Sequence, residues 1–555
     1  MQPIYNNARS NGRAYQAQFG GLNRSPLCAD VEFADMGNLS SDRFPYLSPC
    51  KQRAVKANKS GIEAVTAPKI EANKTITTFT GVADNKFYYE GTQIYYEGTQ
   101  TSKITLDSKY AGKRCLVDFN GNILVLPDKQ YYSYVDKAGG GIALSVESVS
   151  LTFTSSGSVD DSTLKCTISG TGLGVFKSGD ALVISGTGTA ADTVMVSSKY
   201  NQADDDAIVS CVVNSVSGNT LTVTYSNRNG DKVKFPEGGG SQTETGSVVR
   251  GVPEILRACV HNNRVFGYDE SGERIYASKL GDFRNWYAYE GLSTDGWYSE
   301  VGTEGAFTGI AACSMGVVAF KHNYLHLIYG DTPRNFTLQP AIPVGCIDGR
   351  SIVDIQGVLF FLSFDGVYAF SGGYPRRVSD ALDMRYTEGI AGSDGKKYYL
   401  SAKRADGDWE LVVYDLARGV WHREDDFHAV GFFRYNDGFY GADSENVYRM
   451  DAENYATKWY TESKRYDDGT MENRGLNNLY LRIHAREGSK VEVRAKSGDG
   501  DWRLCGSING PFHGVHRFPV RFESRDSYQY KISGEGHAEI EAIERVLYSG
   551  GREER

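Results

Sequence analysis

Long apolar runs are missing from this 555-residue sequence, and the longest, such as VLFFL at 358–362, have only the length of a strand. A helix that crosses a bilayer needs about 20 predominantly apolar residues. The opening residues, MQPIYNNARS, also lack the apolar core of a signal peptide. The sequence therefore predicts a soluble protein that is made in the cytoplasm and has no stable membrane association.

Cysteine motifs are missing too. The nine cysteines are scattered, odd in number and without a CxxC pair, so the sequence implies neither a disulfide framework nor a zinc site. We interpret them as buried thiols of a protein made in a reducing compartment. They are Cys28, Cys50, Cys115, Cys166, Cys211, Cys259, Cys313, Cys346 and Cys505.

Motifs for nucleotide binding and nucleophilic catalysis are absent as well. Neither GxxxxGK[ST] nor GxSxG occurs, and GTGLG at 170–174 lies in a strand-and-turn context that does not lead into a helix. His322 and His326 have the spacing of a zinc-protease motif but lack its glutamate, and His513 and His516 lie in a predicted Gly/Pro loop. The sequence predicts no catalytic residues, no cofactor and no metal ion.

Carboxylates occur in pairs, but only in predicted surface loops, as at Asp425 with Asp426 and at 204–206. A glycosidase needs two carboxylates on opposite sides of the scissile bond, and a sequence does not place them. A sialidase would show several S-x-D-x-G-x-x-W turns, whereas one imperfect match, at 497–502, lies outside the predicted propeller. A propeller glycoside hydrolase is therefore the least favoured of three functional hypotheses.

Positive charge is scarce in the middle of the chain. Residues 1–75 carry ten Lys and Arg against six Asp and Glu, which is a net charge of +4, and residues 461–555 carry sixteen of each, which is a net charge of 0. Because the whole chain has a net charge of −9, residues 76–460 have a net charge of −13. Affinity for nucleic-acid phosphates comes from Lys and Arg, so this acidic body argues against tight DNA binding but allows DNA to slide past. A small basic run predicts the solvated face of a linker: Lys51, Arg53, Lys56 and Lys59.

Aromatic residues and glycine are abundant, with 36 Tyr, 25 Phe and 63 Gly. This composition favours an all-β fold with many turns. The stretch at 261–298 shows the pattern most clearly, because RVFGY and RIYAS predict two strands around the turn DESGE. After a second turn, GDFRN, the segment WYAYEG predicts a third strand with its aromatics on one face.

Similar strand groups recur through residues 249–460. They start near Arg257, Thr308, Arg350, Thr387 and His428, at separations of 51, 42, 37 and 41 residues. A period of about 40 to 50 residues with four short strands per unit predicts a β-propeller. With a further unit at 76–138, we expect about six blades, with five and seven open, and a sandwich of stacked sheets as the alternative.

The composition also predicts the domain boundaries. Residues 1–75 are rich in Asn, Ser, Gly and Pro and predict an extended N-terminal arm. Residues 76–138 predict the first blade, in which Asn120 and Gly121 mark a tight hairpin. Gly-rich joints enclose Ser-, Thr- and Val-rich strands at 139–248, which predict an inserted β-sandwich or barrel. The remaining blades follow at 249–460 and a C-terminal β-sandwich at 461–555.

Two segments of the chain resemble a known family. HNNRVFGYDESGERIYASKLGDFRNWYAYEG at 261–291, and the blade-like GVLFFLSFDGVYAFSGG at 357–373, are similar to segments of the tail nozzle, or packaged-DNA stabilisation, proteins of short-tailed bacteriophages. The N-terminal GLNRSPLCADVEFADMGNLSSDRFPYLSPCKQR also resembles the openings of phage tail proteins. The resemblance covers about 1–50 and 250–450.

The resemblance implies a propeller that assembles into a ring, usually six-fold, below the portal and its adaptor. Such a ring continues the DNA channel and helps to retain packaged DNA until ejection. The implied partners are further copies of the chain, the portal adaptor, other tail proteins such as fibres, needle or plug, and double-stranded DNA that passes non-specifically. The implied location is the virion tail, and the protein would not be an enzyme.

A tail-tip protein that binds a host receptor or glycan through its sandwiches is the second hypothesis. For all three hypotheses, the residues that we expect to form turns and pack the blades are Asn263, Arg264, Tyr276, Asp282, Trp286, Gly366 and Tyr368.

Overall fold

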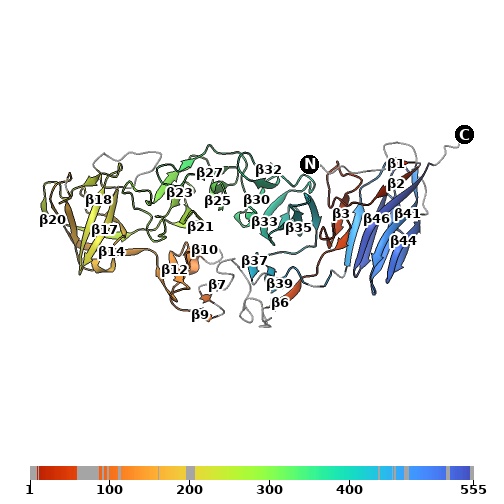
Figure 1. Cartoon of the computed structure of the whole chain (residues 1–555), viewed down its shortest axis with the longest axis horizontal. Coiled ribbons are helices and arrows are strands. Elements are labelled where there is room, and N and C mark those ends of the chain that lie inside the picture. The colour runs from red at the N-terminus through yellow and green to blue at the C-terminus, as the bar shows by residue number, and fades with distance from the viewer. Residues whose placement is uncertain are drawn as a thin grey trace. The chain divides into compact units, whose positions relative to one another are not determined.

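The fold is all-β, and no α-helix occurs among the residues that the computed structural model describes (Figure 1). These are residues 9–10, 12–58, 87–90, 93–96, 99–110, 114–160, 162–194, 207–435, 438–452, 454–455, 458–467, 474–520 and 525–549. Within them, no helix has the length and apolar character to cross a membrane. The chain forms two compact units, one of residues 1–81, 350–370 and 375–555 and one of residues 82–349 and 371–374, and each unit is described by itself below.

The second unit contains three blades, each a four-stranded antiparallel sheet with its strands in chain order. The first strands of neighbouring sheets contact one another, β10 with β21 and β21 with β25, as blades do around an axis. Tyr268 stacks on Phe307 of the next blade with ring centroids 4.9 Å apart. The strands are β10 Cys115–Phe119, β11 Asn122–Leu126, β12 Gln130–Ser133, β13 Ala138–Gly141, β21 Ile255–His261, β22 Arg264–Asp269, β23 Arg274–Ala277, β24 Trp297–Glu300, β25 Phe307–Cys313, β26 Gly316–Lys321, β27 Leu325–Tyr329 and β28 Thr337–Leu338.

The first unit contains three further blades. The last of them takes its outer strand, β6, from the N-terminal segment. The strands are β29 Val353–Ile355, β30 Val358–Ser363, β31 Gly366–Phe370, β32 Arg376–Arg377, β33 Tyr386–Ser393, β34 Lys397–Arg404, β35 Trp409–Asp415, β36 Val420–Arg423, β37 Gly431–Tyr435, β38 Gly438–Ala442, β39 Asn446–Arg449 and β6 Ala54–Asn58. The six blades among the described residues confirm the predicted number, and each of the five predicted repeat starts lies within three residues of the beginning of β21, β25, β29, β33 or β37.

The hairpin of the first blade has the predicted turn. Asn120 and Gly121 both adopt positive φ, 49° and 79°, between the paired residues Phe119 and Asn122, as a two-residue type I′ turn requires. The blade itself begins only at β10. The tyrosines of the upstream YYEGTQ repeat lie in a separate three-stranded sheet of β7 Phe87–Glu90, β8 Gln93–Tyr96 and β9 Thr99–Thr101, and residues 76–86, 91–92 and 97–98 lie outside the described residues.

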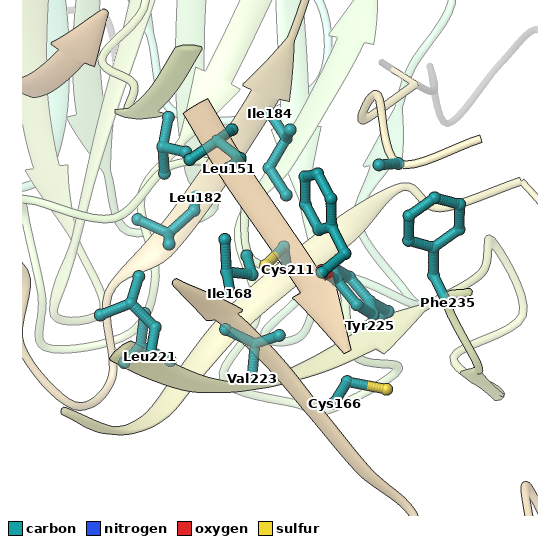
Figure 2. Packing of buried hydrophobic residues seen from close by; sticks show 14 of the residues in the cluster. Leu151, Cys166, Ile168, Leu182, Ile184, Cys211, Leu221, Val223, Tyr225 and Phe235 are labelled. Atoms are coloured by element: carbon teal, nitrogen blue, oxygen red, sulfur yellow. The ribbon is translucent and has the colours of Figure 1, made fainter. Parts of the chain in front are cut away.

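The inserted domain is a closed six-stranded barrel rather than a sandwich. Its strands pair in the order β14-β15-β18-β17-β16-β20 and back to β14, which leaves no unpaired edge. Leu151, Leu182 and Leu221 are fully buried in its core (Figure 2). The strands are β14 Leu144–Ser156, β15 Lys165–Ser169, β16 Ala181–Ser185, β17 Ser210–Ser217, β18 Thr220–Ser226 and β20 Gly240–Arg250, and β19 Lys232–Val233 is added at β18.

The C-terminal domain is a sandwich of two five-stranded sheets, β1-β2-β46-β41-β44 and β3-β40-β45-β42-β43. Figure 1 shows the N-terminal strand β2 beside the C-terminal strand β46. The strands are β1 Arg9–Ser10, β2 Arg13–Gln16, β3 Phe33–Gly37, β40 Lys458–Ser463, β41 Arg474–Ala485, β42 Lys490–Ser497, β43 Arg503–Asn509, β44 Phe512–Pro519, β45 Tyr528–Glu535 and β46 Ala538–Ser549.

The N-terminal segment therefore differs from the extended arm that its composition suggested. It adds strands to both sandwich sheets and to one blade, and its isolated apolar residues, such as Phe33 and Met36, are buried. An outer strand of a sheet exposes unpaired backbone groups, and strands from distant parts of the chain satisfy them here. Each strand is too short to show a period in the sequence.

Candidate functional site

The loop at 282–295, called the docking loop here, lies where the sequence predicted a third strand. That prediction is wrong, because WYAYEG at 286–291 is not a strand and the sheet continues with β24 instead. Side chains fold the loop locally. The Asp282 carboxylate accepts hydrogen bonds from the backbone N–H of Arg284 at 3.0 Å and from the side chain of Asn285 at 2.6 Å. Such bonds offer the backbone an alternative to a strand ladder.

The far end of the docking loop is fixed by Arg264, whose side chain is buried. Its guanidinium donates to the backbone carbonyl oxygens of Ser278 at 2.8 Å, of Ser293 at 2.6 Å and of Asp295. Burial lowers the pKa of Arg264, and the charge of Asp295 opposes that shift. One side chain thus binds the end of β23 to the end of the loop.

Asp295 closes the loop from within. Its carboxylate accepts from the backbone N–H groups of Glu290 at 2.7 Å and Leu292 at 2.8 Å. Burial raises the pKa of Asp295 even though these bonds oppose the shift. The turn is therefore built by side chains close in sequence, which is why the aromatic alternation alone misidentified it.

The docking loop carries the inserted barrel. The backbone N–H of Ala181 in β16 donates to the Asn285 side-chain oxygen at 2.7 Å, and the N–H of Tyr289 donates to the Ser210 hydroxyl at 3.0 Å. Ala288 packs between Ala181 and Val212 of the barrel. Two hydrogen bonds and an apolar contact thus join the barrel to the blade.

Arg250 makes a second attachment between barrel and blade through the carbonyl oxygen of Ile142, which follows β13 of the blade, and its ion pair with Asp180 lies within the barrel. Arg250, at the end of β20, donates to Asp180 at 2.8 Å and to the carbonyl oxygen of Ile142 at 2.9 Å. The side chains of Arg250 and Asp180 are 5% and 4% exposed, so solvent screens this pair little. The barrel is held both at its strand ends and at the docking loop.

The other predicted anchors in this blade surround the docking loop. Asn263, with φ of 57°, forms the β21–β22 turn and accepts a hydrogen bond from Asn120 at 2.7 Å. Tyr276 stacks on Tyr298 with ring centroids 5.6 Å apart. Trp286 is buried, and its indole N–H donates to the carbonyl oxygen of Phe283 at 2.9 Å. The structure thus brings five of the seven predicted residues together around one loop.

The remaining two anchors lie in another blade. Gly366 begins β31 with φ of 147°, and a Cβ there would collide with the Ser379 hydroxyl. The Tyr368 hydroxyl donates to Asp365 at 2.9 Å. Both residues belong to the first unit, so they form a turn and its support apart from the docking loop.

The histidines that the sequence singled out do not share one site. His326 is buried and hydrogen-bonded to the Thr303 hydroxyl at 2.8 Å, whereas His322 is exposed beside Asn323. His513 and His516 lie in strand β44, not in a loop, because β44 pairs with β41 along its length. In the described part of the chain, no group of three or more His, Cys, Asp and Glu side chains is arranged to hold a metal ion.

The candidate carboxylates make ion pairs. Asp425 binds Arg53, and Asp426 binds Arg423. Asp499, in the partial sialidase-like turn, lies 3.0 Å from Arg465. Residues 204–206 lie outside the described residues.

Sequence reasoning missed a buried charge network, called the N-terminal seam here, that joins the N-terminal segment to β33–β36. At its first contact Glu410, with a side chain only 1% exposed, accepts two hydrogen bonds of 2.8 Å from Arg24. The Tyr386 hydroxyl donates to the same carboxylate at 2.7 Å, and Arg423 donates to it at 3.2 Å. Two parallel N–H···O bonds make a strong and directional ion pair.

Two further contacts continue the seam. Lys397 binds Asp42 at 2.5 Å, and the Ser41 hydroxyl donates to Asp415 at 2.6 Å. Beside them His422 is buried, and neither ring nitrogen has a hydrogen-bond partner among the residues that the structure describes. Burial lowers the pKa of His422 to about 3, and the charge of Lys397 adds to that shift. The imidazole is therefore neutral at physiological pH.

A fourth contact of the seam corrects the expected role of Arg53. Instead of lying on a solvated face, its side chain is 17% exposed and reaches Glu424 at 3.5 Å as well as Asp425. Burial raises the pKa of Glu424 to about 7, although Arg53 opposes the shift. The partners are some 370 residues apart in the chain, so no local sequence pattern pointed to them.

Glu424 gives the seam an expected pH dependence. Its folded pKa of about 7 lies above the ordinary value of 4.5, so the folded protein binds the proton more tightly than the unfolded chain. This contribution to stability is complete below pH 4.5 and is lost as pH rises through 7. We expect the wild-type protein to lose about 2 to 3 kcal/mol from this group between about pH 5 and pH 8, and Glu424→Gln to remove that loss.

Urea unfolding of both proteins over this pH range measures the effect. Asp426→Asn is the matched control, because the Asp426 side chain is 79% exposed and its loss leaves the profile unchanged. Parallel profiles for wild type and Glu424→Gln would contradict the expectation.

Comparison with known proteins finds similar solved structures but no matching family. No family model matches the sequence, and a search of curated protein sequences gives no match. Solved structures to which the chain is similar include three enzymes whose names state a carbohydrate substrate. An exo-β-1,3-galactanase from Phanerochaete chrysosporium is 11% identical, with 52% of this chain and 95% of that chain covered and a TM-score of 0.22.

The other two are similarly remote. A glycoside hydrolase family 43 arabinoxylan arabinofuranohydrolase from Bacillus subtilis is 8% identical, with 79% and 95% covered and a TM-score of 0.17. A Trypanosoma rangeli sialidase is 10% identical, with 86% and 95% covered and a TM-score of 0.18. At these values the similarities assign neither a family nor an activity to this chain.

Proposed function

We propose that this protein is a structural component of a bacteriophage tail, a nozzle subunit that acts by assembly and not as an enzyme. Six copies form a ring on the tail axis, below the portal and its adaptor. The ring continues the DNA channel and helps to retain packaged DNA until ejection. Its partners are the neighbouring copies, the portal adaptor, fibres and a needle or plug, and DNA that passes without specific contacts.

The observation that carries this proposal is the structural role of the residues in the segment that resembles nozzle proteins. Arg264 and Asp282, within the stretch that resembles nozzle proteins, shape the docking loop. That loop in turn bonds the inserted barrel through Asn285 and Ser210. Residues that fix one module to another suit a protein whose task is to hold its shape within an assembly.

The N-terminal seam supports the same proposal. It binds the N-terminal segment to a blade by ion pairs with little exposure, and β2 and β3 bind the same segment to both sandwich sheets. Of these partners, β2 and β46 are close to the two ends of the chain. A subunit of a conduit has to resist force along its length. Buried contacts between distant segments of the chain raise the number of interactions that must break at the same time.

The net charge agrees with a conduit. Residues 76–460 carry −13, and like charge keeps DNA from adhering to a surface that it must pass. In a ring built from identical subunits, each contact joins two different surfaces and closes only by rotation. The number of subunits therefore depends on the angle between those surfaces.

Electron microscopy of the purified chain and of the particle that contains it tests the proposal. We expect rings of six copies from the purified chain and density for the same ring on the tail axis of the particle. Absence of this chain from the axis would overturn the nozzle assignment. Density at the tail tip, with binding on a glycan array, would establish the receptor-binding alternative, and turnover of a polysaccharide would establish the hydrolase.

A further inference from the structure

A cavity of about 700 Å³ lies in the second unit, between β24 of one blade and the segment 333–341 that contains β28 of the next. This volume is within the range of small-molecule sites. None of the predicted anchor residues lines it. The side chains that matter for its chemistry are those of Trp297, Ser299, Thr303, His326, Arg334 and Phe336.

The inner wall of the cavity combines aromatic and hydroxyl groups. Trp297 and Phe336 meet edge to face with ring centroids 5.5 Å apart. Ser299 and His326 are buried at 3% and 2% exposure, and the His326 ring shares a hydrogen bond with Thr303. Apolar rings beside hydroxyl groups fit a ligand that presents both C–H and O–H groups, as a sugar ring does.

A buried lysine lies behind the wall of the cavity. Lys321 is 1% exposed behind the wall and donates to the carbonyl oxygen of Thr303. Burial lowers the pKa of this lysine, and the charge of Glu273 opposes that shift. Glu273 therefore offsets part of the cost of this buried charge, and the cation that the cavity itself offers to an anion is Arg334.

Arg334 adds an available cation at the mouth of the cavity. It is exposed and makes no ion pair with any residue that the structure describes. A guanidinium binds carboxylate and phosphate groups through two parallel hydrogen bonds. Arg334 can therefore hold an anionic group while the rest of the ligand enters between Phe336 and Thr303.

We propose that this cavity binds a small anionic sugar derivative of one or two rings, either a sugar acid or a sugar phosphate. The Arg334 guanidinium binds the charged group. The hydroxyls of Ser299 and Thr303 bond the ring hydroxyls, and Phe336 and Trp297 contact the C–H face. This site does not depend on the proposed role in a phage tail.

Isothermal titration of the full-length protein tests the site with three probes: glucuronic acid, glucose 6-phosphate and glucose. We expect saturable binding of at least one anion, about tenfold tighter than that of glucose, because a charge-assisted hydrogen bond is lost with the neutral sugar. The tighter of the two anions identifies the charged group. Absence of binding by all three, or equal binding of glucose, would overturn the proposal.

Two variants and one control variant test whether the binding occurs in the cavity. Arg334→Gln is expected to weaken anion binding about tenfold and to leave glucose binding unchanged, whereas Arg284→Gln, an exposed arginine outside the cavity, leaves both unchanged. Thr337→Trp places an indole at the mouth from an exposed position and is expected to abolish binding. Unaltered titrations with Arg334→Gln and Thr337→Trp would place any binding elsewhere. Ring formation of the chain is measured separately, so failure here does not affect the tail proposal.

Discussion

Replacing Arg264 by methionine is expected to destabilise the second unit by about 3 kcal/mol and to loosen the barrel from its blade. Methionine fills much of the volume but donates no hydrogen bond. The carbonyl oxygens of Ser278, Ser293 and Asp295 then lose the guanidinium that binds them together. Because these oxygens fix the end of the docking loop, the loss spreads to its contacts with the barrel.

Hydrogen–deuterium exchange distinguishes this effect from general destabilisation. The backbone N–H groups of Ala181 and Tyr289 are bonded to Asn285 and Ser210, and we expect their exchange to accelerate in Arg264→Met while exchange in the first unit stays as in wild type. Arg264→Lys keeps the positive charge but lacks the planar guanidinium that donates to several carbonyl oxygens, so we expect its exchange rates to lie between those of wild type and Arg264→Met.

Arg284→Met is the matched control for Arg264. This residue lies in the same loop, is 40% exposed and pairs with Asp282 at 3.2 Å, so its loss costs no more than about 0.5 kcal/mol. Equal exchange at Ala181 and Tyr289 in the Arg264 and Arg284 variants would show that the carbonyl contacts of Arg264 do not hold the loop.

Replacing Glu410 by glutamine is expected to cost the first unit about 3 to 5 kcal/mol. Glu410 accepts from Arg24, Arg423 and Tyr386, and its removal leaves two arginines, 15% and 14% exposed, without their common carboxylate. Breaking a buried pair from one side is costly because the remaining charge stays buried. The N-terminal segment is expected to detach first near the start of β35, where Arg24 contacts it, while the bond of Ser41 to Asp415 at the end of that strand remains.

The pH dependence gives an independent measure of this contact. Burial alone would raise the pKa of Glu410, but the hydrogen bonds and charge of Arg24 outweigh it, so the folded pKa lies below the ordinary value of 4.5. Its contribution to stability is then present above pH 4.5 and is lost as pH falls through the folded pKa. We expect the wild-type advantage over Glu410→Gln, measured by urea unfolding, to shrink on acidification below about pH 4.5.

A double-mutant cycle with Arg24→Met isolates the pair. The two substitutions are expected to be non-additive by about 1 to 3 kcal/mol, because they remove one shared interaction. Asp408→Asn, in which the exposed ion pair with Arg404 is lost, is the control and changes stability by less than about 0.5 kcal/mol. Additive costs for Arg24 and Glu410 would show that the pair is not coupled.

The local order of the chain determined much of the fold. Alternating apolar residues and turn residues at a spacing of about 40 predict four-stranded blades, and six such blades are present. Asn120 and Gly121 predict their own turn because few residues adopt positive φ without strain. The Ser-, Thr- and Val-rich composition of 139–248 likewise separated the barrel from its surroundings. Each of these signals depends on neighbours along the chain.

Only the tertiary structure decided how these parts are joined. The segment at 286–291 has the alternation of a strand, yet Asp282, Asp295 and Arg264 fold it into the loop that meets the barrel. The N-terminal strands find partners in β40 and β46, and Arg24 finds Glu410, across more than 380 residues. Periodicity reports which residues are buried along one element. It does not show which distant strand will pair with a strand edge, or which distant residue will form an ion pair with a buried charge, because these contacts form only when the whole chain packs.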